Sequence, residues 1–245
     1  MSKGLFVTAT DTEVGKTFIS GAITAALRER GIKIGVVKPV ASGCVTGING
    51  QLVSEDANFL MAAAGMGEER RHEVNPVCLE PALTPAVAAE ACGITIDVAK
   101  LNGACRHMLE NSEVTVVEGV GGITAPIWQD YLVADMIEEL GLPAVLVVRP
   151  NLGTINHTVL TAAYAKQRGI KLAGIIVNRW DEDKVTLLET SNVAYIERLT
   201  GLPVLGKFPS VPVVQEDQVS MRELAGLAEQ HLAIDQLLQG MRGEK

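Results

Sequence analysis

A short apolar run near the N-terminus leads directly into a Gly-Lys-Thr triplet and then into a helix-patterned segment. The run is Leu5–Thr10, the triplet is Gly15–Thr17, and helical spacing continues to Arg30. In a strand–loop–helix unit of this kind, backbone N–H groups and the positive end of the helix surround an anionic phosphate. The lysine reaches the terminal phosphates, and the threonine hydroxyl is placed to bind Mg²⁺. We therefore predict a phosphate-binding loop at Asp11–Thr17.

The loop departs from the strict G-x-x-x-x-G-K-[ST] pattern because Thr10 occupies the first glycine position. The alternative interpretation is a plain strand-to-helix turn that carries a surface lysine. A Gly-Lys-Thr triplet that opens a helix directly after the first buried strand favours phosphate binding over that alternative.

Short β-branched runs alternate with longer helix-patterned segments along the chain. The predicted strands are Leu5–Thr10, Lys33–Val40, Val114–Glu118, Ala144–Arg149, Leu172–Asn178 and Val204–Phe208. The predicted helices are Thr17–Arg30, Glu55–Ala64, Ala86–Ala91, Leu132–Leu140 and Asn156–Arg168. This alternation predicts an α/β fold with a doubly wound, mainly parallel sheet flanked by helices, of the P-loop NTPase-like kind. Ligands of such sheets bind beyond the carboxyl ends of the strands.

Glycines mark the ends of several predicted helices, and no long linker or internal repeat interrupts the pattern. Gly31, Gly141, Gly169 and Gly201 each follow a helix pattern and precede a strand, as helix-ending glycines do. Thr84-Pro85 is typical of an N-cap followed by proline at the first helical position. We predict a single domain over residues 1–245, closed by an amphipathic C-terminal helix at about 221–241.

Composition excludes several classes of function. The chain has 21 basic and 29 acidic residues, a formal charge of −8, so sequence-independent nucleic-acid binding is not expected. No stretch approaches the ~18–20 apolar residues that a membrane span requires. The N-terminus shows no signal-peptide pattern, and the four cysteines show no CxxC spacing. These features predict a cytoplasmic protein with reduced thiols and no membrane partner.

Charged residues near the predicted strand ends are the candidates for chemistry. Glu118 ends a strand and is followed by a glycine-rich turn, where a carboxylate can hold Mg²⁺ while glycines admit a nucleotide closely. Asp56 lies in the first turn of a predicted helix, where it could simply stabilise the helix dipole. Lys38 lies at the end of the second predicted strand, and a solvated lysine is an equally good interpretation of that position.

Taken together, the motifs resemble those of the dethiobiotin synthetases of biotin biosynthesis. The resemblance rests on FVTATDTEVGKT at 6–17, KPVASG at 38–43, VEGVGG at 117–122, LGTINHTVL at 152–160 and AGIIVN at 173–178. It implies an ATP-dependent cyclo-ligase that converts 7,8-diaminononanoate and CO₂ to dethiobiotin, with ADP and phosphate as products. In that reaction an amine captures CO₂ as a carbamate, ATP activates it as a carbamic–phosphoric anhydride, and the second amine closes the ring.

The resemblance also implies roles for individual residues. Lys16 and Lys38 would neutralise the γ-phosphate and the carbamate, and Thr17, Asp56 and Glu118 would bind Mg²⁺. The implied ATP contacts are Glu13, Val14, Gly15, Lys16, Thr17, Phe18, Asp56, Glu118, Gly119, Val120, Gly121, Asn178, Arg179, Pro209, Ser210 and Val211. The implied diamine contacts are Thr12, Glu13, Ser42, Gly153, Thr154, Ile155 and Asn156.

The family is homodimeric, with an active site near the subunit interface. The resemblance implies that the helix start at Gly153–Asn156 serves the active site of the partner subunit, where its N–H groups would suit the substrate carboxylate. Judged from the residues alone, the same segment is an ordinary helix start.

Two positions depart from the family pattern. Ala9 stands where the family usually has glycine, so its φ must be negative. Thr84-Pro85-Ala86 stands where the family often has Ser-Pro-His, so any role of that histidine is absent here. Neither position carries a phosphate, metal or carbamate group.

Two other functions compete with this interpretation. The first is an ATPase of the cobyrinate-amidating, partition or nitrogenase-reductase type; partition ATPases typically carry a second lysine early in the loop, where this chain reads Thr10–Glu13. The amidating enzymes usually add a glutaminase domain, for which 245 residues are too few. The second is a nucleotide-sensing module without catalysis, which would bind nucleotide without turnover.

Overall fold

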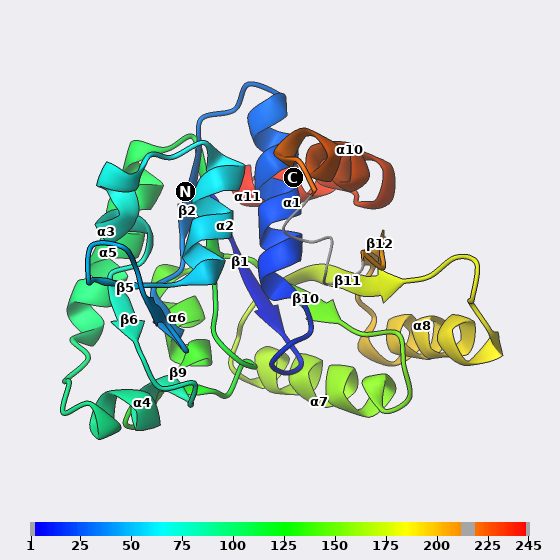
Figure 1. The fold of residues 1–245 in the computed structure, drawn as a ribbon. Helices are drawn as coiled ribbons and strands as arrows, with labels where there is room; N and C mark the ends of the chain where they lie inside the picture. Colours follow the sequence, from blue (N-terminus) through cyan, green and yellow to red (C-terminus); the bar gives the residue numbers. More distant parts are fainter. Residues whose placement is uncertain (1–2, 212–218, 244–245) are drawn as a thin grey trace.

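Six parallel strands form the central sheet of the computed structural model, which describes residues 3–211 and 219–243 (Figure 1). Their order across the sheet is β12-β11-β10-β1-β7-β2. Their bounds are β1 Gly4–Ala9, β2 Ile34–Val37, β7 Val114–Glu118, β10 Ala144–Val148, β11 Leu172–Trp180 and β12 Val204–Pro209. Every residue of β1, β2, β7 and β10 is buried, as expected for a parallel sheet covered on both faces. The doubly wound α/β prediction is confirmed.

Helices connect the strands and cover the sheet. They are α1 Lys16–Glu29, α2 Glu55–Ala64, α3 Arg71–Val74, α4 Pro85–Ala91, α5 Val98–Asn111, α6 Val133–Leu140, α7 Thr154–Gln167, α8 Leu187–Thr200, α10 Met221–His231 and α11 Ile234–Arg242, with a 3₁₀ turn at Glu68–Arg70. The buried helix α1 lies between α2 and α10, while α7 and α8 lie side by side at the opposite edge of Figure 1. No helix among the described residues has both the length and the apolarity needed to cross a membrane.

Within the described residues, three small two-stranded sheets accompany the main one. They are β3 Val40–Ser42 with β6 Val77–Leu79, β4 Val45–Thr46 with β5 Leu52–Val53, and β8 Pro126–Trp128 with β9 Tyr131–Leu132. The first of these holds the segment after β2 in place, because Ala41 pairs with Cys78 in parallel register. The chain after β2 therefore runs as an ordered strand along the edge of the ligand region.

The strand order brings distant parts of the sequence together at one edge. The chain passes from β1 to β2, returns to insert β7 between them, and then adds β10, β11 and β12 on the other side of β1. The connections therefore change direction beside β1. In open parallel sheets the ligand binds at such a switch point, beyond the carboxyl ends of the strands. The loop that follows β1 lies at this place.

Three predicted elements were wrong in detail. The strand predicted at Lys33–Val40 breaks at Lys38-Pro39, because proline has no N–H to donate and the N–H of Lys38 turns to the carbonyl of Val74 at 2.8 Å. The helix predicted at 221–241 is two helices: Leu232 is extended and bridges to Gly206 of the core strand β12. The helix predicted at Asn156–Arg168 begins two residues earlier, at Thr154, within the helix start predicted at Gly153–Asn156.

Other local predictions are confirmed. Gly31, Gly141, Gly169 and Gly201 all have positive φ after their helices. Thr84 is the N-cap of α4, and Pro85 occupies its first position. The prediction that residues 1–245 form a single domain stays a prediction.

Candidate active site

The loop between β1 and α1 has a strained backbone that favours glycine at one position. Gly15 has a φ of +90°, and a Cβ added there would lie 2.1 Å from Nδ2 of Asn178. Glu13 also has a positive φ, +54°, a conformation that costs a non-glycine residue on the order of 1–3 kcal/mol. Ala9, by contrast, ends β1 and is not among the residues of positive φ, so alanine is compatible with this position. Backbone strain of this kind is typical of functional loops.

Asn178, at the carboxyl end of β11, ties that strand to the loop. Its Nδ2 donates a hydrogen bond to the carbonyl oxygen of Val14 at 2.9 Å, and both residues are buried. Replacement of Gly15 would displace this amide. The close approach of Gly15 and Asn178 therefore explains why the Gly-Lys-Thr triplet needs its glycine.

Lys38 is the centre of a buried charge cluster beside the loop. Its Nζ lies 2.6 Å from Oε1 of Glu118 and 2.8 Å from Oδ2 of Asp56, and it also donates to the carbonyl oxygen of Gly119 at 3.2 Å. Burial by itself would lower the pKa of Lys38, but the two carboxylates outweigh it and the pKa is raised. Lys38 thus keeps its positive charge at every physiological pH.

The pKa of the aspartate in this cluster is shifted in the opposite direction. Burial would raise the pKa of Asp56, but Lys38 and the hydroxyl of Thr17 hold it below the ordinary value. Glu118 is completely buried, so the interpretation of it as an exposed residue before a loop is excluded. Its pairing with Lys38 satisfies the rule that buried charges occur in compensated sets.

Lys16 has a different environment from Lys38. It is buried at the start of α1, and its Nζ donates to the carbonyl oxygen of Asp11 at 3.2 Å. Burial, followed by repulsion from Lys38, lowers its pKa to about 8. Lys16 is therefore a cation whose charge an incoming phosphate would stabilise.

The carboxylates and the hydroxyl near Lys38 fit a magnesium ion. Oε1 of Glu118 accepts hydrogen bonds from the hydroxyl of Thr17 at 2.8 Å and from Lys38, while Oε2 is buried and finds no partner among the described residues. A buried carboxylate oxygen without a partner is costly unless a ligand completes it. No group of three or more His, Cys, Asp or Glu side chains in the described part of the chain could hold a metal alone. Mg²⁺ suits such a site because it commonly takes one or two carboxylates together with phosphate oxygens and water.

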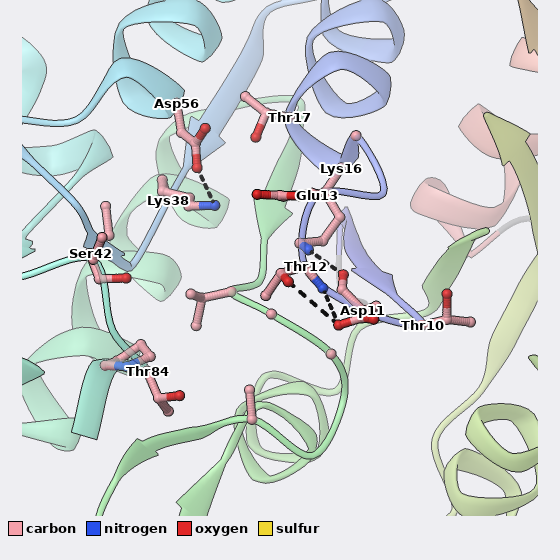
Figure 2. A pocket seen from close by; sticks show the side chains of 18 of the residues that line it. Thr10, Asp11, Thr12, Glu13, Lys16, Thr17, Lys38, Ser42, Asp56 and Thr84 are labelled. Atoms are coloured by element: carbon pink, nitrogen blue, oxygen red, sulfur yellow. Dashed lines mark hydrogen bonds and ion pairs between the residues drawn. The ribbon is translucent and has the colours of Figure 1, made fainter. Parts of the chain in front are cut away.

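These groups border a cavity of about 1290 Å³, here called the main cavity (Figure 2). It is lined by Thr10, Asp11, Thr12, Glu13, Gly15, Lys16, Thr17, Phe18, Lys38, Ala41, Ser42, Asp56, Ala82, Leu83, Thr84, Pro85, Val120, Gly121, Gly122, Thr124, Ala125 and Arg179. Figure 2 shows Lys38 directed toward Asp56, with the loop residues Thr12 and Lys16 on one side and Ser42 and Thr84 on the other. The cavity thus has a charged end at the loop and a mostly apolar end at Ala82–Pro85.

Some predicted site residues lie behind this surface. Val14, Glu118 and Asn178 are buried and do not belong to the lining of the main cavity. Gly119 joins them through its carbonyl contact with Lys38. The segment Pro209–Val211 does not line the cavity, although Ser210 donates its N–H to the carbonyl of Trp180, close to Asn178 in sequence.

The structure does not bring Gly153–Asn156 to the main cavity. Gly153, Ile155 and Asn156 line a second, smaller hollow of about 450 Å³ between α7 and α8, here called the α7–α8 hollow. Its other lining residues are Leu152, Val159, Leu160, Asn192 and Leu199. Within one chain, the segment predicted to meet the substrate carboxylate is separate from the residues predicted to meet the diamine.

Several lining residues were absent from the sequence predictions. Leu83, Thr124 and Ala125 border the main cavity from loops whose positions depend on tertiary folding, and no local sequence pattern signals them. Arg149 was also missed as a site residue, although it directly follows β10 and the strand-end rule could have found it. Ala86, at the position of the missing histidine, is buried in α4 and does not line the cavity.

Comparison with known proteins identifies the family. A model described as an AAA domain matches residues 3–218. The ATP-dependent dethiobiotin synthetase BioD of Bacillus licheniformis is 41% identical over 219 residues, covering 89% of this chain and 90% of that protein. The enzyme of the same name from Bacillus cereus is 37% identical over 241 residues, covering 98% and 96%.

Solved structures that resemble the chain show the fold alone. The septum site-determining protein MinD of Pyrococcus horikoshii, complexed with Mg-ADP, has a TM-score of 0.58 at 17% identity and covers 99% of this chain and 96% of its own. A ParA family ATPase of Chlorobium tepidum has a TM-score of 0.57 at 16% identity, covering 98% and 97%. Partition-type ATPases therefore share this architecture, whereas the sequence relatives are synthetases. The chain belongs to the dethiobiotin synthetase family of P-loop proteins.

Proposed function

We propose that the chain is an ATP-dependent dethiobiotin synthetase that joins 7,8-diaminononanoate and CO₂ into a cyclic urea. The reaction gives dethiobiotin, ADP and phosphate, through a carbamate and a carbamic–phosphoric anhydride. The observation that supports it most is the meeting of Lys16 and Lys38, from two different strand–loop connections, at one cavity. A reaction between a phosphate and a carbamate needs a fixed positive charge for each, placed close together.

The two lysines have different roles, which follow from their different surroundings. Lys38 is held by Glu118 and Asp56, so it is a permanently charged group in a fixed position, suited to neutralise the carbamate. Among the described residues, Lys16 donates a hydrogen bond only to a backbone carbonyl, so its side chain can turn to the γ-phosphate and neutralise the charge that develops there. Positioning and charge neutralisation of this kind account for most of the catalysis of phosphoryl transfer.

Thr17, Asp56 and Glu118 are the residues that would hold Mg²⁺. When bound, the ion supplies charge neutralisation for the phosphate oxygens of ATP. Glu118 offers its unpartnered Oε2, and the hydroxyl of Thr17 already points to the same carboxylate. The contact between Asp56 and Lys38 keeps the aspartate ionised, as metal binding requires.

Asn178 is proposed to recognise the adenine base. Its Nδ2 is committed to the carbonyl of Val14, which fixes the amide and leaves Oδ1 to accept from an exocyclic amine. Arg179 follows it with a left-handed backbone, φ +60°, and lines the main cavity. We assign Phe18, Val120 and the segment Pro209–Val211 to the remaining nucleotide contacts.

A second copy of the chain is proposed to complete the substrate site. Thr12, Glu13 and Ser42 would contact the diamine within one chain, whereas Gly153–Asn156 would contact the carboxylate tail bound to the partner. The exposed leucines around the α7–α8 hollow support this: Leu152 is 82% and Leu160 62% exposed. Apolar side chains gathered on one surface commonly mark an interface. We place this homodimer in the cytoplasm, with no membrane or nucleic-acid partner.

The test is turnover by the purified protein with ATP, Mg²⁺, bicarbonate and 7,8-diaminononanoate. Diamine-dependent phosphate release, with a product of the mass of dethiobiotin, is expected. Nucleotide binding without diamine-dependent release would identify a nucleotide sensor instead and would exclude the synthetase. Omission of bicarbonate is the control, because the carbamate cannot form without CO₂.

A further inference from the structure

Three carbonyl groups of the phosphate loop accept hydrogen bonds from side chains, two of which come from the ends of β10 and β11. Lys16 donates to the carbonyl of Asp11 at 3.2 Å, and Asn178 donates to that of Val14 at 2.9 Å. Between these two, Nη2 of Arg149 donates to the carbonyl of Thr12 at 2.8 Å. When the carbonyl of one residue is held on one side, the N–H of the following residue points the opposite way, because both groups belong to the same planar peptide unit. These contacts therefore determine where the loop presents its N–H groups.

The position of Arg149 follows from the sheet. Ala9 pairs with Val147 in the parallel register of β1 and β10, and the N–H of Thr10 reaches the carbonyl of Val147 at 3.3 Å. Two residues beyond Val147, the side chain of Arg149 therefore lies beside the loop as it leaves the sheet. A rigid strand end is a better support for a loop than another loop.

We propose that Arg149 is a positioning residue that holds the Thr12 carbonyl and so aims the N–H groups of the phosphate loop at the nucleotide. The proposal rests on the proposed function for the identity of the nucleotide. Its effect would be greatest at Glu13, which directly follows Thr12 and has a positive φ. An unfavourable backbone conformation persists only where its neighbours enforce it.

Arg149 differs from Lys16 in what happens during the reaction. Lys16 is needed by the γ-phosphate, and when it turns to that group it releases the carbonyl of Asp11. Arg149 lies outside the lining of the main cavity, so its contact can persist with nucleotide bound. The loop would then keep its shape through Arg149 and Asn178 at the moment when Lys16 is occupied.

The experiment measures ADP binding by calorimetry in the presence of Mg²⁺, for wild type, Arg149→Met and Arg149→Lys. Loss of a charged hydrogen bond at a half-buried position should raise the Kd of Arg149→Met about 5- to 30-fold. Arg149→Lys retains a charged donor and should recover most of the affinity. The matched control is Arg28→Met, because the guanidinium of Arg28 also donates to a backbone carbonyl, that of Ala62 at 3.3 Å, at the far end of α1. Its Kd should stay within about twofold of wild type.

Salt distinguishes positioning from simple attraction of charge. Screening shortens the reach of exposed charges to a few ångström near 1 M salt. The ratio of Kd between Arg149→Met and wild type should therefore remain the same at 0.05 and 0.5 M NaCl if Arg149 acts through the loop. A ratio that falls to about one at high salt, or a Kd equal to that of Arg28→Met, would overturn the proposal.

Kinetics add a further readout and separate this inference from the proposed function. Because a residue that positions the loop acts on nucleotide binding, Arg149→Met should raise KM for ATP more than it lowers kcat at saturating ATP. A larger effect on kcat would instead place Arg149 in the chemical step and contradict the positioning role. Wild-type protein that binds ADP but makes no product would disprove the synthetase while leaving the ADP results for Arg149 decisive.

Discussion

The main cavity and the α7–α8 hollow differ in almost every physical respect. The main cavity carries two buried lysines, the loop strain at Glu13 and the carboxylate of Asp56. The α7–α8 hollow carries no charged residue in its lining, and its walls are leucine, isoleucine and valine with Asn156 and Asn192. The first contains charge held in fixed positions, whereas the second offers apolar surface and backbone.

Their positions in the fold explain this contrast. The main cavity lies beyond the carboxyl ends of β1, β7 and β2, where parallel strands deliver side chains to one place. The α7–α8 hollow lies between two neighbouring helices, and leucines of its lining are exposed at the surface of the molecule. We infer that the chemistry belongs to one chain, and that recognition of the substrate tail belongs to the contact between two chains.

Replacing Lys38 should have the largest effect of any change at the main cavity. Lys38→Met should lower kcat by about 10³-fold or more, because a preorganised charge at the reacting group is lost. ADP binding should change less than tenfold, since Lys16 and the loop remain. Steady-state turnover together with calorimetry checks both expectations. Turnover near that of wild type would remove Lys38 from the mechanism.

A second variant separates the loss of chemistry from a loss of folding. Lys38→Met leaves Glu118 buried without its cation, which should destabilise the protein by roughly 3–5 kcal/mol. The double variant with Glu118→Gln removes the uncompensated charge and should recover much of the free energy of unfolding in urea. It should remain inactive, which assigns the loss of turnover to the site.

Gly15 tests whether the shape of the loop matters as much as its charge. In Gly15→Ala, the new Cβ would meet Nδ2 of Asn178 at 2.1 Å in a backbone of φ +90°. We expect ADP affinity to fall about 10²-fold, because the loop must move from the geometry that presents its N–H groups. The control is Gly31→Ala, where φ is +78° and a Cβ meets nothing within 4 Å. The control should lose about 1 kcal/mol of stability and bind ADP normally; equal losses of affinity in both variants would contradict the role of Asn178.

Many of the charged residues at the main cavity could be predicted, because the ends of buried strands can be located from the sequence. Lys16, Lys38 and Glu118 all follow or end buried strands, and parallel strands gather their carboxyl ends at one edge. Asp56 shows where this reasoning stops: its local pattern indicated only a helix start, and its contact with Lys38 depends on how α2 packs. Periodicity likewise detected the six strands of the central sheet, four of which are buried throughout, but not the short strands of the small sheets.

The rest depended on tertiary contacts. The helix predicted at 221–241 is interrupted at Leu232 because that residue bridges to Gly206. An amphipathic pattern carries no local signal of this contact. The helices α5 and α8 were missed as well. Asn178 was predicted as an adenine contact, but its hydrogen bond to Val14 joins residues 164 positions apart. Contacts of that range follow only from the assembled sheet.

The α7–α8 hollow is tested by placing a charge on its rim. Leu199 is 53% exposed and lines the hollow, so Leu199→Glu should weaken association of two copies through the cost of burying a carboxylate. We expect KM for the diamine to rise about tenfold, with ADP affinity unchanged. Sedimentation and steady-state kinetics check these outcomes. Ile94→Glu, at an exposed position beyond α4, is the control and should change neither quantity. A wild-type protein that is monomeric and fully active would contradict the proposal that the α7–α8 hollow contributes to the substrate site of a partner.

The pH dependence of nucleotide binding gives the smallest expected effect and sharpens the difference between the two lysines. Because the pKa of Lys16 is lowered to about 8, the nucleotide-free protein loses this charge as pH rises through that value. A bound phosphate restores the charge, so ADP binding at pH 9 should take up a proton, and Kd should rise severalfold between pH 7.5 and 9. Lys38, whose pKa is raised, contributes nothing in this range. Calorimetry in buffers of different ionisation enthalpy measures the uptake; Lys16→Arg, which stays charged, should show none, and an equal uptake in both proteins would assign the proton to another group.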